Sequence, residues 1–168
     1  LSNDEDQFDR MRWKPFNAIT RITNPITQEH TMMRHFLLPG LLRLLASNRH
    51  HDLPQSVYEL GTVVRDHTNM DRLAFLTAER TGGFAAIRGR IQAFLRDIGA
   101  ENVVIEALPE NEGPWLAGRA ARVLLDGEWV GCFGEIDPSI SQTFELLVPL
   151  NGAEFDVEAL KLAITDPV

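Results

Sequence analysis

Six leucines crowd into residues 37–46, LLPGLLRLLA, and this segment constrains the fold more than any other part of the chain. As a helix, it would be apolar over far more than the single stripe that an amphipathic surface helix presents. Such a helix has to be covered on several sides, so the segment predicts a central core helix. A contact between subunits is the alternative that the same leucines leave open.

Short β-rich runs occupy much of the remaining chain, separated by turn signals. The strongest signal is Asp126-Gly127, which favours a two-residue hairpin turn between runs 119–125 and 128–136. The other predicted strands cover residues 18–22, 56–65, 73–78, 102–107 and 153–157. Most of the connections are hairpins or meanders rather than repeated βαβ crossovers. The predicted fold class is therefore α+β, an antiparallel sheet with helices packed on it.

Three further helices are predicted. Apolar residues recur at helical spacing over residues 84–98, and Gly99 is placed to end that helix. A capping-box pattern, Ser2 followed by Glu5, predicts a short helix within residues 2–11. The last helix is expected at residues 158–164, after the final strand.

The charge balance excludes one class of function. Asp and Glu number 24 against 16 Lys and Arg, which gives a net charge of −8. That charge opposes attraction to a polyanion, so the chain is not expected to hold nucleic acid through a basic surface. With Lys14 and Lys161 as the only lysines, the composition fits an ordinary acidic microbial protein and a protein from a salt-loving host.

The chain has the features of a cytoplasmic protein without membrane contact. The single cysteine, Cys132, excludes an intrachain disulfide and suits a reducing compartment. No apolar run approaches the ~20 residues needed to span a bilayer. Because the first residue is Leu1 rather than methionine, residues 1–168 are expected to be one module of a longer chain.

No motif for metal binding or catalysis stands out when residues are taken singly. A structural zinc site needs four ligands, usually in closely spaced pairs, and adjacent His50-His51 cannot both face one ion. Gly82-Gly83 lacks the spacing of a phosphate loop and predicts a turn. Cys132 is expected to be a small buried residue. Glu135 and Asp137 could hold a metal or act as acid and base, but Asp137-Pro138 more simply starts a turn.

Several short motifs nevertheless follow one another in a distinctive order. They are an Asn-Pro step, a Met-Arg pair, the Leu-Leu-Pro-Gly-Leu-Leu run, Asn-Arg, Glu-Leu-Gly, Gly-Arg-Ala-Ala and Gly-Glu-Ile-Asp-Pro. The motif residues are Asn24, Pro25, Arg34, Pro39, Gly40, Asn48, Glu59, Gly61, Gly118, Arg119, Gly134, Glu135 and Pro138. Over nearly the whole chain this order resembles the C-terminal catalytic-like module of the phenylalanine–tRNA synthetase beta subunit, in its archaeal and eukaryotic form. Asp137 stands where that family commonly has histidine.

The resemblance implies a fold like that of class II aminoacyl-tRNA synthetases, an antiparallel sheet flanked by helices. It implies an alpha-subunit partner in an (αβ)2 assembly, with tRNA bound by the holoenzyme. ATP and magnesium would serve the holoenzyme, and no cofactor is expected in this chain. The first class II motif would lie upstream of Leu1.

The resemblance also indicates where a nucleotide site would be. In an active class II domain, one arginine after the second motif's strand grips the ATP α-phosphate, and another in the third motif holds the γ-phosphate. Arg65 stands at the first position, although His67 replaces the expected glutamate. Residues 155–160, at the third motif, contain no arginine, and Lys161 is the only basic residue in 151–168.

Losing one such phosphate contact costs roughly 3–4 kcal/mol of transition-state stabilisation. We therefore expect no catalytic residue in this chain, with Arg65 a vestigial nucleotide-site position and catalysis in the alpha subunit. The predicted function is a non-catalytic structural and assembly module of phenylalanine–tRNA ligase. One alternative is a ligand-binding module that retains a class II-like pocket for an amino acid or nucleotide, using Arg65, Arg34 and Trp115. A freestanding enzyme is a third possibility.

Overall fold

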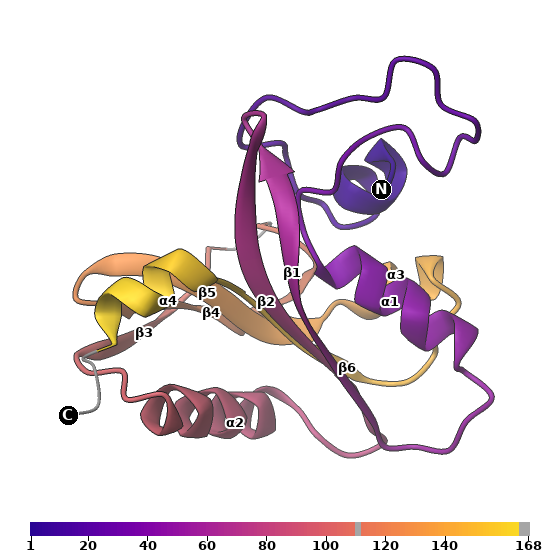
Figure 1. The fold of residues 1–168 in the computed structure, drawn as a ribbon. Coiled ribbons are helices and arrows are strands. Elements are labelled where there is room, and N and C mark those ends of the chain that lie inside the picture. The colour runs from indigo at the N-terminus through magenta and orange to yellow at the C-terminus, as the bar shows by residue number, and fades with distance from the viewer. Residues whose placement is uncertain (110–111, 165–168) are drawn as a thin grey trace.

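The computed structural model describes residues 1–109 and 112–164 and shows one antiparallel sheet with helices on both faces (Figure 1). The strands are β1 (Gln55–Arg65), β2 (Thr68–Ala78), β3 (Val103–Ala107), β4 (Trp115–Leu125), β5 (Glu128–Ile136) and β6 (Leu150–Asp156). The helices are α1 (Leu38–Ser47), α2 (Phe84–Asp97), α3 (Pro138–Thr143) and α4 (Val157–Ala163), after a π-helical turn at Glu5–Asp9. The predicted α+β class is confirmed.

The six strands lie in the order β1-β2-β6-β5-β4-β3, and every neighbouring pair is antiparallel. The last strand in the chain, β6, therefore occupies the middle of the sheet, between β2 and β5. Helix α2 connects β2 to β3, which lie on opposite sides of β6. The outermost strands are β1 and β3.

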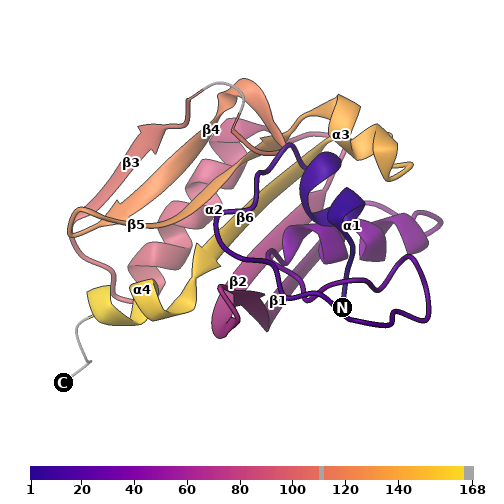
Figure 2. The same cartoon turned by 90° about the horizontal axis from the view of Figure 1, so that it is seen from above.

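Each face of the sheet carries its own apolar core. Leu38, Leu42 and Leu45 of α1 pack on one face, whereas α2 packs on the other through Ile87 and Ile91. Figure 2 shows the N-terminal segment on the same side of the molecule as α1. The leucine-rich segment is thus the predicted core helix, and among its leucines only Leu44 is exposed, at 43 %. Its contact with another subunit remains a prediction.

Most predicted elements are confirmed to within a few residues. Asp126 and Gly127 have φ values of 49° and 82°, the pair of positive values that a type I′ hairpin turn requires. Gly99, with φ of 79°, follows the end of α2 as expected. The strand predicted over 73–78 begins earlier, at Thr68, because a two-residue turn at Asp66-His67 pairs the whole of β1 with β2.

The strand predicted over residues 18–22 is wrong. This segment makes only one isolated bridge, between Arg21 and Met32. The Ile22 amide bonds to the Thr31 carbonyl and the Met33 amide to the Thr20 carbonyl, at 3.0 and 2.9 Å. A β-branched run becomes a strand only where a long partner lies beside it, and this segment has just a few residues opposite it.

Two helix starts also differ from the prediction. The N-terminal turn is π-helical, and its N-cap residue, Asp4, makes no capping hydrogen bond through its side chain. The Asp6 amide donates to Asn3 Oδ1 at 2.8 Å rather than to Ser2. At Asp137-Pro138 the chain begins the short helix α3 instead of a simple turn. The Asp137 carboxylate accepts from the Ser139 amide at 2.9 Å and proline occupies the first turn, an arrangement that starts a helix.

Candidate functional site

Arg65, which the sequence predicts to be a vestigial nucleotide-site position, ends β1 and is held by contacts within the chain. Its Nε and Nη2 both donate to the His35 carbonyl oxygen, at 3.1 and 2.9 Å. The guanidinium carbon lies 4.7 Å from the centre of the Phe36 ring and 5.5 Å from that of Phe16, within cation–π range. Burial and the charge of Arg72 lower the pKa of Arg65 to about 10. The side chain is therefore cationic at neutral pH, but two of its nitrogen atoms donate to a backbone carbonyl.

The turn that follows Arg65 is short. Asp66 and His67 have φ values of 52° and 59° and connect β1 directly to β2. His67 Nδ1 lies 2.8 Å from Thr20 Oγ1. His67, which stands where the resemblance to an active class II domain leads one to expect glutamate, is therefore bonded to the N-terminal segment.

A cavity of about 590 Å³ lies beside Arg65. Its walls combine aromatic and charged side chains with a floor on β5. The lining residues are Arg12, Trp13, Lys14, Phe16, Phe36, Arg65, Arg72, Leu108, Glu112, Gly113, Trp115, Trp129, Val130, Gly131, Cys132 and Asp156. Arg65 and Trp115 are thus brought together, as the ligand-binding alternative expects. Burial raises the pKa of the Cys132 thiol to about 12, so it is no nucleophile at neutral pH.

Among the described residues, 150–164 contribute no cationic side chain to this cavity. Phe155 of β6 is fully buried in the core. Asp156 accepts from the Ala159 amide at 3.1 Å and caps α4. Lys161, the one basic residue after position 150, is exposed and pairs with Glu158 at 3.1 Å.

Arg72 and Glu154 form a buried pair beneath the cavity. Arg72 Nε donates to Glu154 Oε2 at 2.7 Å, and the two side chains are 10 % and 1 % exposed. Oε1 of Glu154 accepts from the amides of Leu37 and Leu38, at 2.7 and 2.8 Å. One carboxylate therefore joins β2 and β6 to the start of α1, and no motif in the sequence singles it out.

Three residues of the motif order lie together: Arg34, from the segment before α1, contacts Glu59 and Gly61 of β1. Arg34 Nη1 lies 2.7 Å from Glu59 Oε1, and Arg34 Nε donates to the Thr62 carbonyl at 2.9 Å. A Cβ at Gly61 would lie 2.6 Å from Arg34 Nη2, so the glycine leaves room for the guanidinium. Arg34 is not among the residues that line the Arg65 cavity.

Gly118, Arg119, Gly134 and Glu135 form a second group, across β4 and β5. Gly118 has φ of 71° and lies at an irregularity in the register of β4 with β5. Ala120 pairs with Gly134, whose missing side chain allows the two strands to approach closely. Glu135 Oε1 accepts from the Phe84 amide at 2.6 Å and lies 4.0 Å from Arg119 Nη1. The Phe84 amide at the start of α2, just after Gly82-Gly83, is thus already bonded to a carboxylate of this chain, that of Glu135.

The remaining motif residues shape the ends of elements. Pro39 lies in the first turn of α1, Asn48 ends that helix, and Pro138 starts α3. Apart from its chain neighbours and the backbone of its own helix, no described residue has a heavy atom within 4 Å of where a Cβ of Gly40 would be. Asn24 and Pro25 are exposed in the N-terminal loop. Asp137, where the family commonly has histidine, pairs with Arg12 at 2.9 Å. Its burial raises the carboxyl pKa, but the bonds from Ser139 and Arg12 outweigh this and lower it overall.

His35 is expected to make stability depend on pH. Its side chain is fully buried, and burial, with the charge of Arg65, lowers its pKa below 6.5. The unfolded histidine takes up a proton near that pH and the buried ring does not, so the unfolded state gains stability on acidification. The free energy of unfolding should therefore fall as the pH drops below about 6.5. In urea titrations, His35→Leu should flatten this fall and His51→Gln, at an exposed position, should not. Equal slopes for both variants would contradict the assignment.

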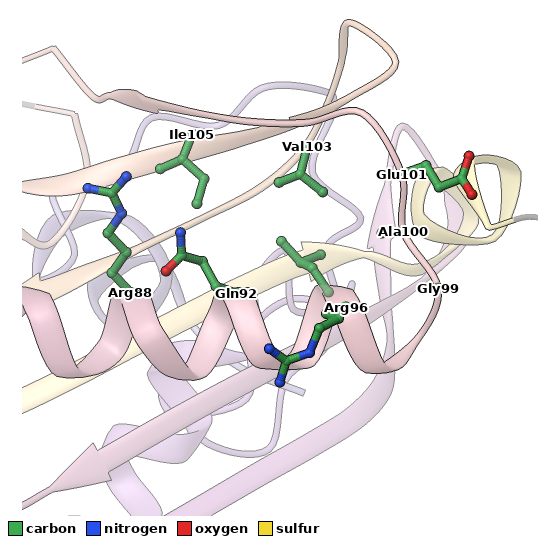
Figure 3. Close-up of a pocket in the computed structure, with 9 residues that line it drawn as sticks. Arg88, Gln92, Arg96, Gly99, Ala100, Glu101, Val103 and Ile105 are labelled. Carbon is green, nitrogen blue, oxygen red and sulfur yellow. The ribbon is translucent and has the colours of Figure 1, made fainter.

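A separate groove runs between α2 and β3, with a volume of about 470 Å³. Figure 3 shows Arg88 and Gln92 pointing from α2 toward Ile105 and Val103 of β3. Arg88, Gln92 and Arg96 follow one another at four-residue spacing, the sequence signal that places them on one helix face. None of the motif residues lies in this groove.

Two classes of feature are missing from the part of the chain that the structure describes. In residues 1–109 and 112–164, no three His, Cys, Asp or Glu side chains gather as they would around a metal ion. Over the same residues, no helix has the length and apolar character to cross a membrane.

Comparison with known proteins identifies the same family that the order of the motifs indicates. Residues 2–157 match the family described as the phenylalanyl tRNA synthetase beta chain CLM domain. The chain is 35% identical, over 95% of its length, to the phenylalanine–tRNA ligase beta subunit of Archaeoglobus fulgidus, and 36% identical, over 97%, to that of Methanopyrus kandleri. The subunit of Methanothrix thermoacetophila is 34% identical over 94% of the chain. The chain spans only 28–29% of these relatives.

Proposed function

The chain belongs to the family of the phenylalanyl-tRNA synthetase beta chain CLM domain, and on that premise we propose that it is a non-catalytic structural and assembly module of a phenylalanine–tRNA ligase. Residues 1–168 form one catalytic-like module of the beta subunit, with the class II synthetase fold and a C-terminal place in that subunit. The module packs against the alpha subunit in an (αβ)2 enzyme of the cytoplasm. The holoenzyme binds tRNA, and the alpha subunit uses ATP and magnesium.

The main observation behind this proposal is that the Arg65 guanidinium is already bound by groups of this chain. A phosphate clamp has to present the edge of its guanidinium to the ligand. In this chain that edge donates twice to the His35 carbonyl, and the planar face lies over Phe36. Asp156 is the one residue after position 150 among the described residues that line the cavity, and the sequence from 151 onward contains no arginine. Three of the four cationic side chains that line the cavity are bonded within the chain: Arg65 to the His35 carbonyl, Arg72 to Glu154 and Arg12 to Asp137.

The proposal predicts that Arg65→Met leaves catalysis by the assembled enzyme nearly unchanged. ATP–pyrophosphate exchange by the holoenzyme should stay within about twofold of the wild-type rate, whereas loss of a true phosphate clamp would lower it ~10²–10³-fold. Arg122→Met, at a half-exposed position on β4, controls for general effects of removing a guanidinium. Size-exclusion chromatography checks that each variant still assembles. A hundredfold loss in an assembled Arg65→Met enzyme would show that the module takes part in adenylation.

Assembly is tested directly by co-purification. The full-length beta subunit should retain the cognate alpha subunit on an affinity column at near-stoichiometric ratio. Failure of the two full-length subunits to associate would refute the assembly role.

The ligand-binding alternative has one observation in its favour. Arg65 and Trp115 do line a common cavity, although Arg34 lies elsewhere, paired with Glu59. Calorimetry with ATP and with phenylalanine separates the two functions, because micromolar binding of either ligand by the full-length beta subunit would favour a retained pocket.

A further inference from the structure

The groove between α2 and β3 opens at the edge of the sheet. β3 is an outermost strand and pairs only with β4 among the described strands, so the backbone groups on its other edge have no strand beside them. Among the described residues, those that line the groove come from α2, from the connection after it and from β3, and none comes from β4. A chain segment in this groove would therefore lie beside the free edge of β3.

The helix wall of the groove is basic, although the chain as a whole is acidic. Helix α2 carries Arg88, Arg90 and Arg96 against a single acid, Asp97, whereas acidic residues outnumber basic ones by 24 to 16 over the whole chain. Arg88 makes no ion pair with a described residue. Arg96 has only its neighbour Asp97, at 3.6 Å, and both of those side chains are exposed. Because exposed ion pairs are weak, Arg88 and Arg96 are both available to an anionic partner.

The strand wall of the groove is apolar. Val103 and Ile105 lie two residues apart on one face of β3 and point toward α2 (Figure 3). Val103 is 37 % exposed, and Leu95 of α2 lines the groove between the two walls. An apolar side chain placed here would bury these residues and be flanked by the two arginines.

We propose that this groove binds an extended acidic segment of a partner protein, which adds a strand to the free edge of β3. Arg88 and Arg96 lie eight residues apart in one helix, which corresponds to a rise of ~12 Å. Four residues of an extended chain span ~13 Å, and every second residue lies on the same face. A segment of the form acid-x-apolar-x-acid therefore places one carboxylate on each arginine and its apolar side chain on Val103 and Ile105.

The apolar wall and the free strand edge favour a peptide over a nucleic acid strand, whose phosphates can also pair with arginine. Glu101 lines the groove at the opposite end from Arg88 (Figure 3), and its charge disfavours a continuous row of phosphates. The groove shares no lining residue with the cavity around Arg65. This inference and the assembly role can therefore fail independently.

The probe is the peptide acetyl-Gly-Glu-Thr-Leu-Thr-Glu-Gly-amide, titrated into the full-length beta subunit and followed by saturation-transfer difference NMR. A Kd of about 1 mM is the expected scale for a ligand of this size. Two control peptides should bind at least ~3-fold more weakly. One has glutamine in place of both glutamates. The other, acetyl-Gly-Glu-Thr-Leu-Glu-Thr-Gly-amide, has the same composition but directs its two acids to opposite faces.

Strand addition is tested by N-methylation of the peptide backbone. Alternate residues of an added strand direct their N–H groups toward its neighbour. One peptide is N-methylated at the leucine and another at both threonines, and exactly one of the two should lose binding. Equal binding by both would contradict pairing with β3.

Variants of the beta subunit assign the site to the groove. Arg88→Gln and Arg96→Gln should each raise the Kd of the peptide ~3-fold, and the double variant ~10-fold. Arg90→Gln is the matched control on the same helix, because Arg90 is bonded to Glu79 at 2.8 Å and does not line the groove; it should leave the Kd unchanged. Glu101→Gln should lower the Kd, since it removes a like charge.

Four results would overturn the proposal. They are the absence of saturable peptide binding up to about 10 mM, equal affinity for either control peptide, and an unchanged Kd in a double arginine variant that keeps the wild-type circular dichroism spectrum. The fourth is tighter binding of a single-stranded RNA heptamer that the same double variant abolishes, which would identify nucleic acid as the occupant.

Discussion

Replacing Glu154 with alanine should lower the free energy of unfolding by about 3–5 kcal/mol, the usual cost of removing one partner of a buried ion pair. The Glu154 side chain is 1 % exposed and accepts three hydrogen bonds, from Arg72 and from the amides of Leu37 and Leu38. The variant would leave the Arg72 charge buried without its carboxylate. It would also leave two amides at the start of α1 without an acceptor.

Urea unfolding of Glu154→Ala measures this effect against a matched exposed pair. Glu106→Ala removes a carboxylate that pairs with Arg122 on the neighbouring strand at 2.7 Å. Both side chains of that pair are more than a third exposed, so about 0–1 kcal/mol is expected. Glu154→Gln should fall between the two because the amide oxygen still accepts from the helix. Similar losses for Glu154→Ala and Glu106→Ala would contradict a connecting role for the buried carboxylate.

The hydrogen bonds of Glu154 also illustrate what cannot be predicted from the sequence. The strand around it was predicted because residues 153–157 carry a local β pattern, and the helix around Leu38 because its leucines recur densely. The bond between them joins positions 116 and 117 residues apart. Nothing local in either segment indicates it, because the contact depends on β6 inserting between β2 and β5.

The same distinction, between local patterns and long-range contacts, explains which elements the sequence predicts and which it does not. The hairpin at Asp126-Gly127 and the helix over residues 84–97 depend on turn chemistry and periodicity, which neighbouring residues carry. The strand expected over residues 18–22 has the right residue types but only an isolated bridge to pair with. Helix α3 is not predicted because an Asp-Pro step fits the start of a turn as well as that of a helix. The helix is favoured by the tertiary packing of Ile140, which is only 4 % exposed.

For the candidate site, the resemblance to a class II domain singled out Arg65, but it could not indicate which groups its guanidinium binds. Its position at the end of β1 follows from local sequence. Its hydrogen bonds to the His35 carbonyl and its contact with Phe36 depend on how the N-terminal segment crosses the hairpin. The pairing of Arg34 with Glu59 over Gly61 is likewise a tertiary fact that gives three motif residues a common structural cause.

Gly134 and Gly40 belong to the same motif order, yet their replacement by alanine should change stability in opposite directions. A Cβ at Gly134 would lie 2.7 Å from the Ala120 Cα and would also strike the Arg119 carbonyl oxygen, both backbone atoms of the paired strand. Because backbone atoms cannot rotate away, Gly134→Ala should force β4 and β5 apart and cost about 3 kcal/mol.

Gly40 is the matched control, since it lies within α1 and a Cβ there would meet no other described part of the chain within 4 Å outside its own helix backbone. Gly40→Ala should stabilise the chain by about 0.5–1 kcal/mol, because alanine favours the helix and restricts the unfolded chain. Thermal and urea unfolding of the two variants gives the sign of each effect. If both variants have a lower free energy of unfolding, Gly40 faces a partner surface or another constraint that lies outside the packing of this chain. Stabilisation at both would mean that β4 and β5 separate at little cost, which would contradict the close approach at Ala120.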